Sequence, residues 1–271
     1  MSGAPLLEAR DLRKTFVASA GGFSRAARTI AAVDGVSLEL AAGETLAIVG
    51  ESGSGKTTLA RLLMRLEEPD SGTIRFEGEN LLAARGARLR ALRREMQMVF
   101  QDPYASLDPR LSVEAQVGEP LAIHEAQLGR GARRARVVEA LEAVGLGAEV
   151  LARYPHEFSG GQRQRIGIAR ALVLRPKLVV ADEPVSALDV SVGAQILALL
   201  AQLQSAYALT YLIVSHSLPV VAQLAARIAV MHGGRVVETG PAEQILERPA
   251  HPYTQALVAA VPELPTSSVS R

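Results

Sequence analysis

The sequence predicts an α/β fold with an N-terminal β-sheet subdomain and an inserted, mostly helical subdomain. Two observations predict it. The apolar run 45–49 is followed by a glycine-rich loop and then by leucines at helical spacing, which indicates the order strand, loop, helix. The run 178–181 is short, continuous and apolar, as expected of a strand buried on both faces of a parallel sheet.

The N-terminal subdomain is predicted from two segments that precede the glycine-rich loop. Leu6–Phe16 and Ala32–Leu40 have the character of strands, and we expect them to pair in one sheet. A Gly-, Ser- and Arg-rich excursion, Ala18–Arg28, separates them.

The loop that follows reads GESGSGKTT from Gly50 to Thr58 and matches the pattern GxxxxGK[ST]. Its glycines let the backbone turn tightly and bring N–H groups close to phosphate oxygens, where a Cβ would obstruct the approach. The predicted phosphate-binding residues are Gly50, Gly53, Ser54, Gly55, Lys56, Thr57 and Thr58.

Lys56 and Thr57 have separate roles in this loop. The lysine ammonium can reach the β- and γ-phosphates of a nucleotide, and the threonine hydroxyl is a hard oxygen ligand for Mg²⁺. A glycine-rich turn that holds a lysine by chance is the alternative. It is disfavoured because only three of the 29 basic residues are lysines, and one stands at this position.

A helix is predicted directly after the loop. Its core face is formed by leucines at i, i+3, i+4 and i+7, which should pack the helix on the sheet and hold the loop. These leucines are Leu59, Leu62, Leu63 and Leu66.

A mostly helical stretch runs from about Ala84 to Arg153 and includes Arg133–Val144, which has an apolar stripe. The basic stretches Arg85–Arg94 and Arg130–Arg136 alternate with apolar residues at helical spacing, so we interpret them as solvated helix faces. The net charge of +1 gives no general attraction to nucleic acid, and no nucleic-acid partner is expected.

A second anion site is predicted at the motif Ser159, Gly160, Gly161 and Gln162, which precedes a helix with one apolar face. Ser159 stands at the N-cap position, and a glycine-rich helix N-terminus favours a bound anion. One nucleotide does not need two complete phosphate sites from one chain. The economical solution is a dimer.

The strand 178–181 delivers two carboxylates to the edge of the sheet. Asp182 suits a Mg²⁺ site shared with Thr57, and Glu183 could polarise an attacking water. Acidic pairs at strand ends can also be solvated turn residues, an alternative that the phosphate loop makes improbable.

The remaining elements follow in order. A helix, a strand, a glycine hairpin and a C-terminal helix that begins after a proline are predicted. Their markers are Ile196, Leu199, Leu200 and Leu203 for the helix, Leu209–Ser215 for the strand, Gly233–Gly234 for the hairpin, and Pro249, Pro252 and Tyr253 for the last helix.

Taken together, these motifs resemble the ATP-binding subunit of ABC transporters, which has a P-loop NTPase fold, and the resemblance covers nearly the whole chain. It implies that ATP and Mg²⁺ bind between two cassettes. It also makes Gln101 a Mg²⁺-sensing loop glutamine, His216 a switch histidine and Asp189 part of an interface loop. Phe16 becomes the adenine-stacking residue, with a core role as its alternative.

Two positions depart from the commonest pattern of this family. Phe158 replaces a leucine before the SGGQ motif and should pack against the same core, while Ser217 stands where an aspartate is common and removes a nearby charge. His216 could cap a strand, and Gln101 would be a surface amide in another context.

Several stretches resemble the peptide/nickel importer branch and, within it, the shorter ATPase subunit of dipeptide and oligopeptide permeases. They are QDPYASLDPR at 101–110, RYPHEFSGGQRQR at 153–165, ADEPVSALDVSV at 181–192 and HPYTQAL at 251–257. The resemblance implies one domain over 1–271, with a helical subdomain at about 84–160 and a C-terminal extension at about 241–271.

The same resemblance implies the partners: a second, different ATPase subunit, two transmembrane permease subunits and an extracytoplasmic solute-binding protein. The expected location is the cytoplasmic face of the membrane. The chain has no cysteine, no apolar signal-peptide core and no run of about 18 apolar residues, so a transport path is expected to belong to other chains.

The solute stays open among dipeptides, longer peptides, nickel, glutathione and opines, because this subunit does not need to touch it. A cassette that acts on ribosomes or DNA, or one that binds nucleotide without transport, is the alternative class. The single phosphate loop and the absence of sustained heptads disfavour the first, and the presence of Glu183 and His216 disfavours the second.

Overall fold

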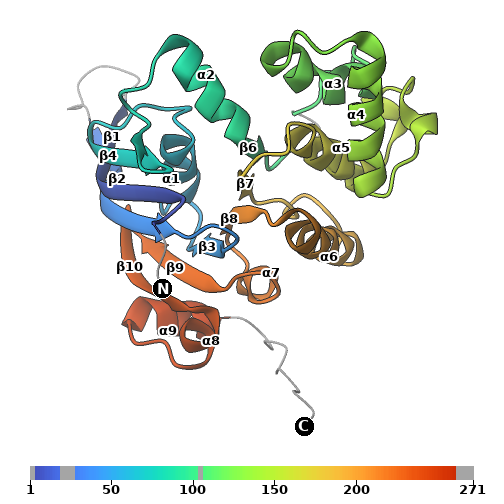
Figure 1. Ribbon diagram of the computed structural model, residues 1–271. Helices are drawn as coiled ribbons and strands as arrows, with labels where there is room; N and C mark the ends of the chain where they lie inside the picture. Colours follow the sequence, from blue (N-terminus) through green and yellow to red (C-terminus); the bar gives the residue numbers. More distant parts are fainter. Residues whose placement is uncertain (1–3, 19–27, 103–105, 261–271) are drawn as a thin grey trace, which may run out of the picture. The chain divides into compact units, whose positions relative to one another are not determined.

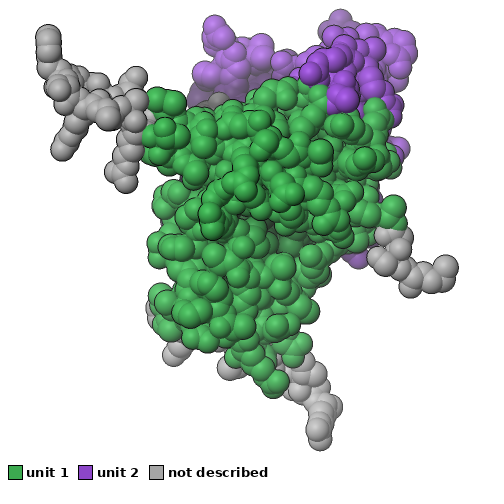
Figure 2. All heavy atoms as spheres, turned by 90° about the vertical axis from the view of Figure 1, so that its left-hand side faces the viewer, with its two compact units in different colours: residues 1–82, 213–271 green, residues 83–212 purple. Residues whose placement is uncertain are grey.

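The computed structural model describes residues 4–18, 28–102 and 106–260, and Figure 1 labels its elements. The chain forms two compact units, shown in Figure 2: unit 1 comprises residues 1–82 and 213–271, and unit 2 comprises residues 83–212. Most of the excursion expected before the second strand, residues 103–105 of the QDPYASLDPR stretch and the end of the C-terminal extension lie outside the described residues.

The N-terminal sheet of unit 1 is antiparallel, with the order β2-β1-β4-β5. Its strands are β1 (Leu7–Ala18), β2 (Arg28–Leu40), β4 (Ser71–Phe76) and β5 (Glu79–Asn80). The two long strands extend beyond the predicted bounds, because Phe16 pairs with Ile30 and Thr15 with Ala31. The predicted sheet is confirmed, and cross-strand pairing decides its length.

Three further strands of unit 1 carry the phosphate loop. β3 (Thr45–Val49) is buried along its whole length, as predicted, and runs parallel to β9 (Arg227–His232). β10 (Arg235–Pro241) is antiparallel to β9. Gly233 and Gly234 join β9 to β10 with φ of 54° and 81°, the left-handed pair that a two-residue hairpin requires.

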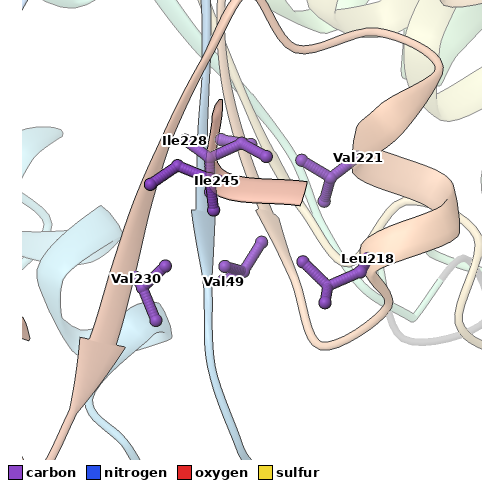
Figure 3. Close-up of a cluster of buried hydrophobic side chains, with 7 residues drawn as sticks. Val49, Leu218, Val221, Ile228, Val230 and Ile245 are labelled. Carbon is purple, nitrogen blue, oxygen red and sulfur yellow. The ribbon is translucent and has the colours of Figure 1, made fainter. Parts of the chain in front are cut away.

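A buried apolar cluster ties the C-terminal helices to these strands (Figure 3). Side chains from β3 and β9 meet others from α7 (Leu218–Ala222) and α8 (Ala242–Glu247), and α9 (Pro252–Ala259) packs against the same cluster. The labelled members are Val49, Leu218, Val221, Ile228, Val230 and Ile245. The predicted C-terminal helix therefore packs against the strand that leads into the phosphate loop.

Helix α1 (Lys56–Leu63) is shorter than the leucine spacing predicts. Its first three marker leucines are buried, but Leu66 is 51% exposed, so its assignment to the core was wrong. The helix stops because Arg65 has φ of 49°; its N–H donates to Leu62 O, and the N–H of Leu66 donates to Arg61 O, each at 2.9 Å. This is a Schellman termination with arginine where glycine is usual.

The Arg65 side chain is buried beneath this termination. Its Nη1 donates to the carbonyl of Leu81 at 2.8 Å and its Nε to Glu68 Oε1 at 3.0 Å. The two bonds provide partners for the buried guanidinium and offset part of the cost of a left-handed residue.

Unit 2 contains the helical stretch and two parallel strands. The helices are α2 (Gly86–Glu95), α3 (Val113–His124), α4 (Arg130–Ala143), α5 (Gly160–Leu172) and α6 (Val190–Tyr207), with short 3₁₀ turns at Ala148–Val150 and Pro155–Glu157. β6 (Met96–Val99) pairs in parallel with β7 (Leu178–Asp182). The chain division falls within β8 (Thr210–Ser215).

The apolar faces predicted for the unit 2 helices are confirmed by burial. The buried side chains are Val137, Leu141 and Val144 of the α4 face, Ile166, Ala169, Leu172 and Val173 of the α5 face, and Ile196, Leu199, Leu200 and Leu203 of α6. Strand β6 was not predicted, because four residues directly after a helix carry no period of their own. Within the described ranges, no helix combines the length and apolar character that crossing a bilayer needs.

Candidate functional site

Two glycines of the phosphate loop are required by the backbone of unit 1 itself. A Cβ on Gly50 would lie 2.1 Å from the carbonyl oxygen of Met231, and one on Gly55 would lie 2.0 Å from that of Ala32. Gly53 has open space around it but has φ of 81°. Close packing of the loop on β2 and β9 is thus a constraint at Gly50 and Gly55 that the phosphate pattern alone did not reveal.

Lys56 is buried, at 5% exposure, and its ammonium is held by the loop. Nζ donates to the carbonyl of Gly50 at 2.7 Å and to that of Glu51 at 2.8 Å. Gly55 is the N-cap of α1, so Lys56 begins the helix, with Thr57 and Thr58 half-buried in its first turn. The ammonium and the helix N-terminus thus place positive charge at one loop.

Ser54 supplies a direct test of whether this loop suits a phosphate. Its Oγ is buried and has no hydrogen-bond partner, while its backbone donates to Glu51 O at 3.2 Å and accepts from Gly234 N at 3.0 Å. A buried hydroxyl without a partner is costly, and an anionic oxygen would accept its proton. The loop therefore fits a phosphate group.

In unit 2, a hydrogen bond joins two predicted residues from distant parts of the sequence. Nε2 of Gln101 donates to Oε2 of Glu183 at 3.0 Å. Glu183 has φ of 47°, and its carbonyl accepts from both the N–H and the hydroxyl of Ser186, at 3.2 and 3.1 Å. Asp182, the last residue of β7, is only 4% exposed. The acidic pair thus lies at the strand end, as predicted.

The SGGQ motif forms a reciprocal cap at the start of α5. Gln162 N donates to Ser159 Oγ at 3.3 Å, and Ser159 N donates to Gln162 Oε1 at 3.1 Å, which confirms the predicted N-cap. A Cβ on Gly161 would lie 2.4 Å from Cγ1 of Val192, and one on Gly160 would lie 3.2 Å from a methyl group of Leu188. The two glycines let the SGGQ and SALD segments of unit 2 pack together.

The other predicted residues have simpler surroundings. Asp189 is the exposed N-cap of α6, and its carbonyl accepts from Gly193 N at 2.8 Å. His216 follows β8 and is exposed. Phe16 is 39% exposed, with Lys14 Nζ 5.7 Å from its ring centroid, so a core role for this ring is ruled out.

The two departures from the family pattern are also accommodated. Phe158 is buried, as expected, and the Arg153 guanidinium lies 4.2 Å from its ring centroid. The N–H of Ser217 donates to Ser215 Oγ at 3.0 Å, so the serine residue closes a local turn after β8.

The predicted residues fall into both units, each described by itself. Lys56, Thr57 and His216 belong to unit 1, whereas Gln101 and Glu183 belong to unit 2, together with Asp182 and the SGGQ motif. In the described part of the chain, no three His, Asp or Glu side chains gather as a metal cluster. A Mg²⁺ ion would therefore depend on hydroxyl, amide and nucleotide oxygens as well as Asp182, a donor set that suits a hard cation.

Sequence reasoning missed one residue at the phosphate loop. The backbone N–H of Glu51 donates to the hydroxyl of Tyr253 at 3.1 Å, and the Tyr253 ring lies against His232 with centroids 4.0 Å apart. The HPYTQAL stretch had been recognised as a helix start and a branch marker. No local pattern indicates a contact between positions 202 residues apart.

Family models match two parts of the chain. The model described as ABC transporter matches residues 33–186, and that described as oligopeptide/dipeptide transporter, C-terminal region, matches residues 237–269.

Curated relatives match nearly the whole chain. The glutathione import ATP-binding protein GsiA of Salmonella paratyphi A is 51% identical over 97% of the chain, and that of Escherichia coli K12 is 50% identical over 97%. The chain covers 42% of the length of each of these relatives.

Solved structures share the fold. The ATP-binding cassette MJ0796, as a dimer bound to ADP and Pi, is 29% identical with a TM-score of 0.76, over 87% of this chain and 98% of that one. The protein cbiO1 from Clostridium perfringens, part of the ABC transporter complex cbiONQ, is 28% identical with a TM-score of 0.77, over 91% and 92%. Since the first family model covers more than half of the chain, and its motifs form the site described above, the chain belongs to the ABC transporter family as an ATP-binding cassette.

Proposed function

We propose that this chain is a Mg²⁺-dependent ATPase subunit that energises the import of di- or oligopeptides through separate membrane permease subunits. The observation that carries the ATPase part is the phosphate loop, with its buried Lys56, its glycine packing and the unpaired hydroxyl of Ser54. The match of residues 237–269 to the C-terminal region of peptide transporters supports the importer branch.

In this proposal, the residues from Gly50 to Thr58 hold the phosphates of ATP. Lys56 neutralises charge on the β- and γ-phosphates, and Ser54 and the first turn of α1 donate hydrogen bonds. Thr57, Asp182 and Gln101 hold Mg²⁺, which supplies charge neutralisation on the phosphate oxygens when it is bound. Phe16 is exposed on β1 and stacks on the adenine.

Hydrolysis needs a group that orients and polarises water, and Glu183 is the proposed base. Its hydrogen bond from Gln101 fixes the carboxylate, and the left-handed backbone anchored by Ser186 fixes the turn that carries it. His216 stabilises the arrangement from the end of β8. Gln101 couples the state of this carboxylate to the permease through the loop that continues to residue 110.

The SGGQ motif acts on the nucleotide of a second cassette in this proposal. The exposed Ser159 and Gln162 and the glycines between them close over the γ-phosphate bound by the partner, and Asp189 lies in the loop that crosses the interface. The dimeric form of MJ0796 bound to ADP and Pi supports a pair of cassettes. We expect the second cassette to be a different chain.

The solute is most simply a short peptide. Glutathione is itself a tripeptide, and the relatives named as glutathione import ATP-binding proteins favour it as the specific alternative. Nickel and opines have no such support. In this proposal, the chain lies at the cytoplasmic face of the membrane, as one domain with a helical subdomain at about 84–160 and a C-terminal extension at about 241–271, and a solute-binding protein lies outside.

Co-purification from the native cell tests the proposal. The full chain is tagged, membranes are solubilised gently, and associated proteins are identified. Two permeases, a second cassette and a solute-binding protein are expected, and uptake of labelled dipeptide, pentapeptide and glutathione by intact cells then ranks the solutes. Recovery of ribosomal or DNA-bound proteins, with no membrane subunit, would support a soluble cassette and overturn the importer assignment.

A further inference from the structure

One peptide unit links the C-terminal segment to the lysine of the phosphate loop. The N–H of the Gly50–Glu51 peptide donates to the hydroxyl of Tyr253 at 3.1 Å, and the carbonyl of the same peptide accepts from Lys56 Nζ at 2.7 Å. A trans peptide is planar, so its N–H and C=O point to opposite sides. Any rotation of this plane moves both hydrogen bonds at once.

The tyrosine is itself held at the start of α9. Pro252 is the first residue of the helix, and the N–H of Tyr253 donates to Nδ1 of His251 at 3.1 Å. The phenol ring lies on His232 at a centroid distance of 4.0 Å and an interplanar angle of 34°. Three neighbours therefore determine where the hydroxyl lies.

The HPY segment, His251–Tyr253, is anchored in turn to β10. The two carboxylate oxygens of Glu238 accept from the backbone N–H groups of Ala250 and His251, at 2.8 and 3.0 Å. Burial opposes ionisation of this carboxyl, but hydrogen bonds including these two outweigh it and lower its pKa. The carboxylate is thus ionised at neutral pH and holds the turn before α9.

We propose that Tyr253 is a positioning residue for nucleotide binding: its hydroxyl orients the Gly50–Glu51 peptide so that the carbonyl of Gly50 holds Lys56 at the phosphate loop. The inference rests on the proposed ATPase function and deepens it. It also gives the C-terminal region, which matches that of peptide transporters, a task in unit 1.

The hydroxyl alone is the element to test. Tyr253→Phe keeps the ring against His232 and the helix start, and removes only the acceptor of the Glu51 N–H. Tyr207→Phe is the matched control, since this tyrosine lies at the end of α6 in unit 2 and is 44% exposed. The full-length variants are compared by hydrogen exchange of the peptide containing Glu51, by equilibrium binding of ATP with Mg²⁺, and by thermal unfolding.

Tyr253→Phe should exchange the Glu51 amide faster and bind ATP about 3- to 10-fold more weakly, the scale of one lost hydrogen bond. Its melting temperature and its turnover at saturating ATP should stay close to wild type, since neither the ring packing nor Glu183 is touched. A merely structural role would lower the melting temperature and leave the affinity of the folded protein unchanged. The control should match wild type throughout.

Unchanged exchange at Glu51, or faster exchange with unchanged ATP affinity, would overturn the inference. Failure of the proposed function is recognised separately, because the wild-type chain would then not bind ATP, or Lys56→Ala would bind as tightly as wild type. In that case the exchange measurement would report only the contact between Tyr253 and the loop.

Discussion

At the scale of single residues, the candidate site is defined by hydrogen-bond partners as much as by residue type. Glu183 is distinguished from other surface glutamates by the bond from Gln101 and by a left-handed backbone, which costs about 1 kcal/mol or more for a residue with a Cβ. Such a conformation persists because Ser186 and the buried strand before it hold the turn. These constraints support a catalytic carboxylate at this position.

Replacing Glu183 by glutamine should lower ATP turnover by roughly 10²-fold or more, because the amide cannot accept a proton from water. ATP binding should be unchanged, since the phosphate-binding loop is intact. Turnover is measured by phosphate release and binding by calorimetry. Glu142→Gln, an exposed change on α4, is the matched control and should behave as wild type. Near-normal turnover in Glu183→Gln would remove this residue from the role of base.

The glycines allow a graded test of stability. Gly55→Ala should destabilise most, because its Cβ would lie 2.0 Å from a backbone carbonyl that cannot move aside. Gly53→Ala has open space but a left-handed φ and should cost about 1–2 kcal/mol. Gly131→Ala, within α4 and without a clash, should be neutral or stabilising by up to about 1 kcal/mol.

Urea titration of the three full-length glycine variants gives their free energies of unfolding. If Gly53→Ala proved as damaging as Gly55→Ala, steric packing on β2 would not be the reason for glycine at position 55.

At the scale of elements, helix ends carry much of the site. α1 begins at Lys56 and α5 at the SGGQ motif, and each N-terminus presents N–H groups that lack partners within the helix. At α5, the reciprocal bonds between Ser159 and Gln162 satisfy two donors and set the direction of the first turn. The cap is thus a structural device at a position that the proposal also assigns to a nucleotide.

Two serine caps separate these structural and functional roles. Ser159→Ala and Ser112→Ala each remove an N-cap acceptor, from α5 and α3, and each should cost about 0.5–2 kcal/mol of stability. Only Ser159→Ala should also lower ATP turnover, because only that helix is proposed to face a nucleotide. Denaturant unfolding and phosphate release are measured on both. Equal turnover in the two variants would leave Ser159 with a capping role alone.

At the scale of the whole molecule, the chain order distributes the site over two units. The chain leaves unit 1 after residue 82 and returns at residue 213, so the phosphate loop and His216 belong to one unit and Glu183 and SGGQ to the other. The motifs that are far apart in sequence are thus assigned to units by topology, and the expected second cassette supplies the complementary half of each nucleotide site.

The paired-cassette proposal predicts a change in mass with ATP. Glu183→Gln should retain ATP and form a stable pair with its second cassette, so light scattering should report about twice the 28.7 kDa of this chain. Adding Lys56→Ala to the same variant should abolish the pair, because nucleotide would no longer bind. A mass that does not respond to ATP with the second cassette present would contradict the sandwich arrangement.

The sequence by itself determined the class of fold, the phosphate loop, the acidic strand end, the N-cap at Ser159 and the family. Each of these is encoded locally: β3, β7 and the hairpin at Gly233–Gly234 depend on residues within a few positions of one another. The end of α1 was mispredicted because Arg65, not glycine, occupies the left-handed position, and its stabilising partners lie near β5 and beyond the helix.

Only the tertiary structure decided the rest. Strand β6 exists because β7 pairs with it, the Gln101–Glu183 bond joins residues 82 positions apart, and Tyr253 contacts Glu51 across 202 positions. Glycine at positions 50 and 55 is required by carbonyls of β9 and β2. A residue's periodicity and type report its own helix or strand, whereas long-range contacts depend on which buried surfaces meet when the chain folds.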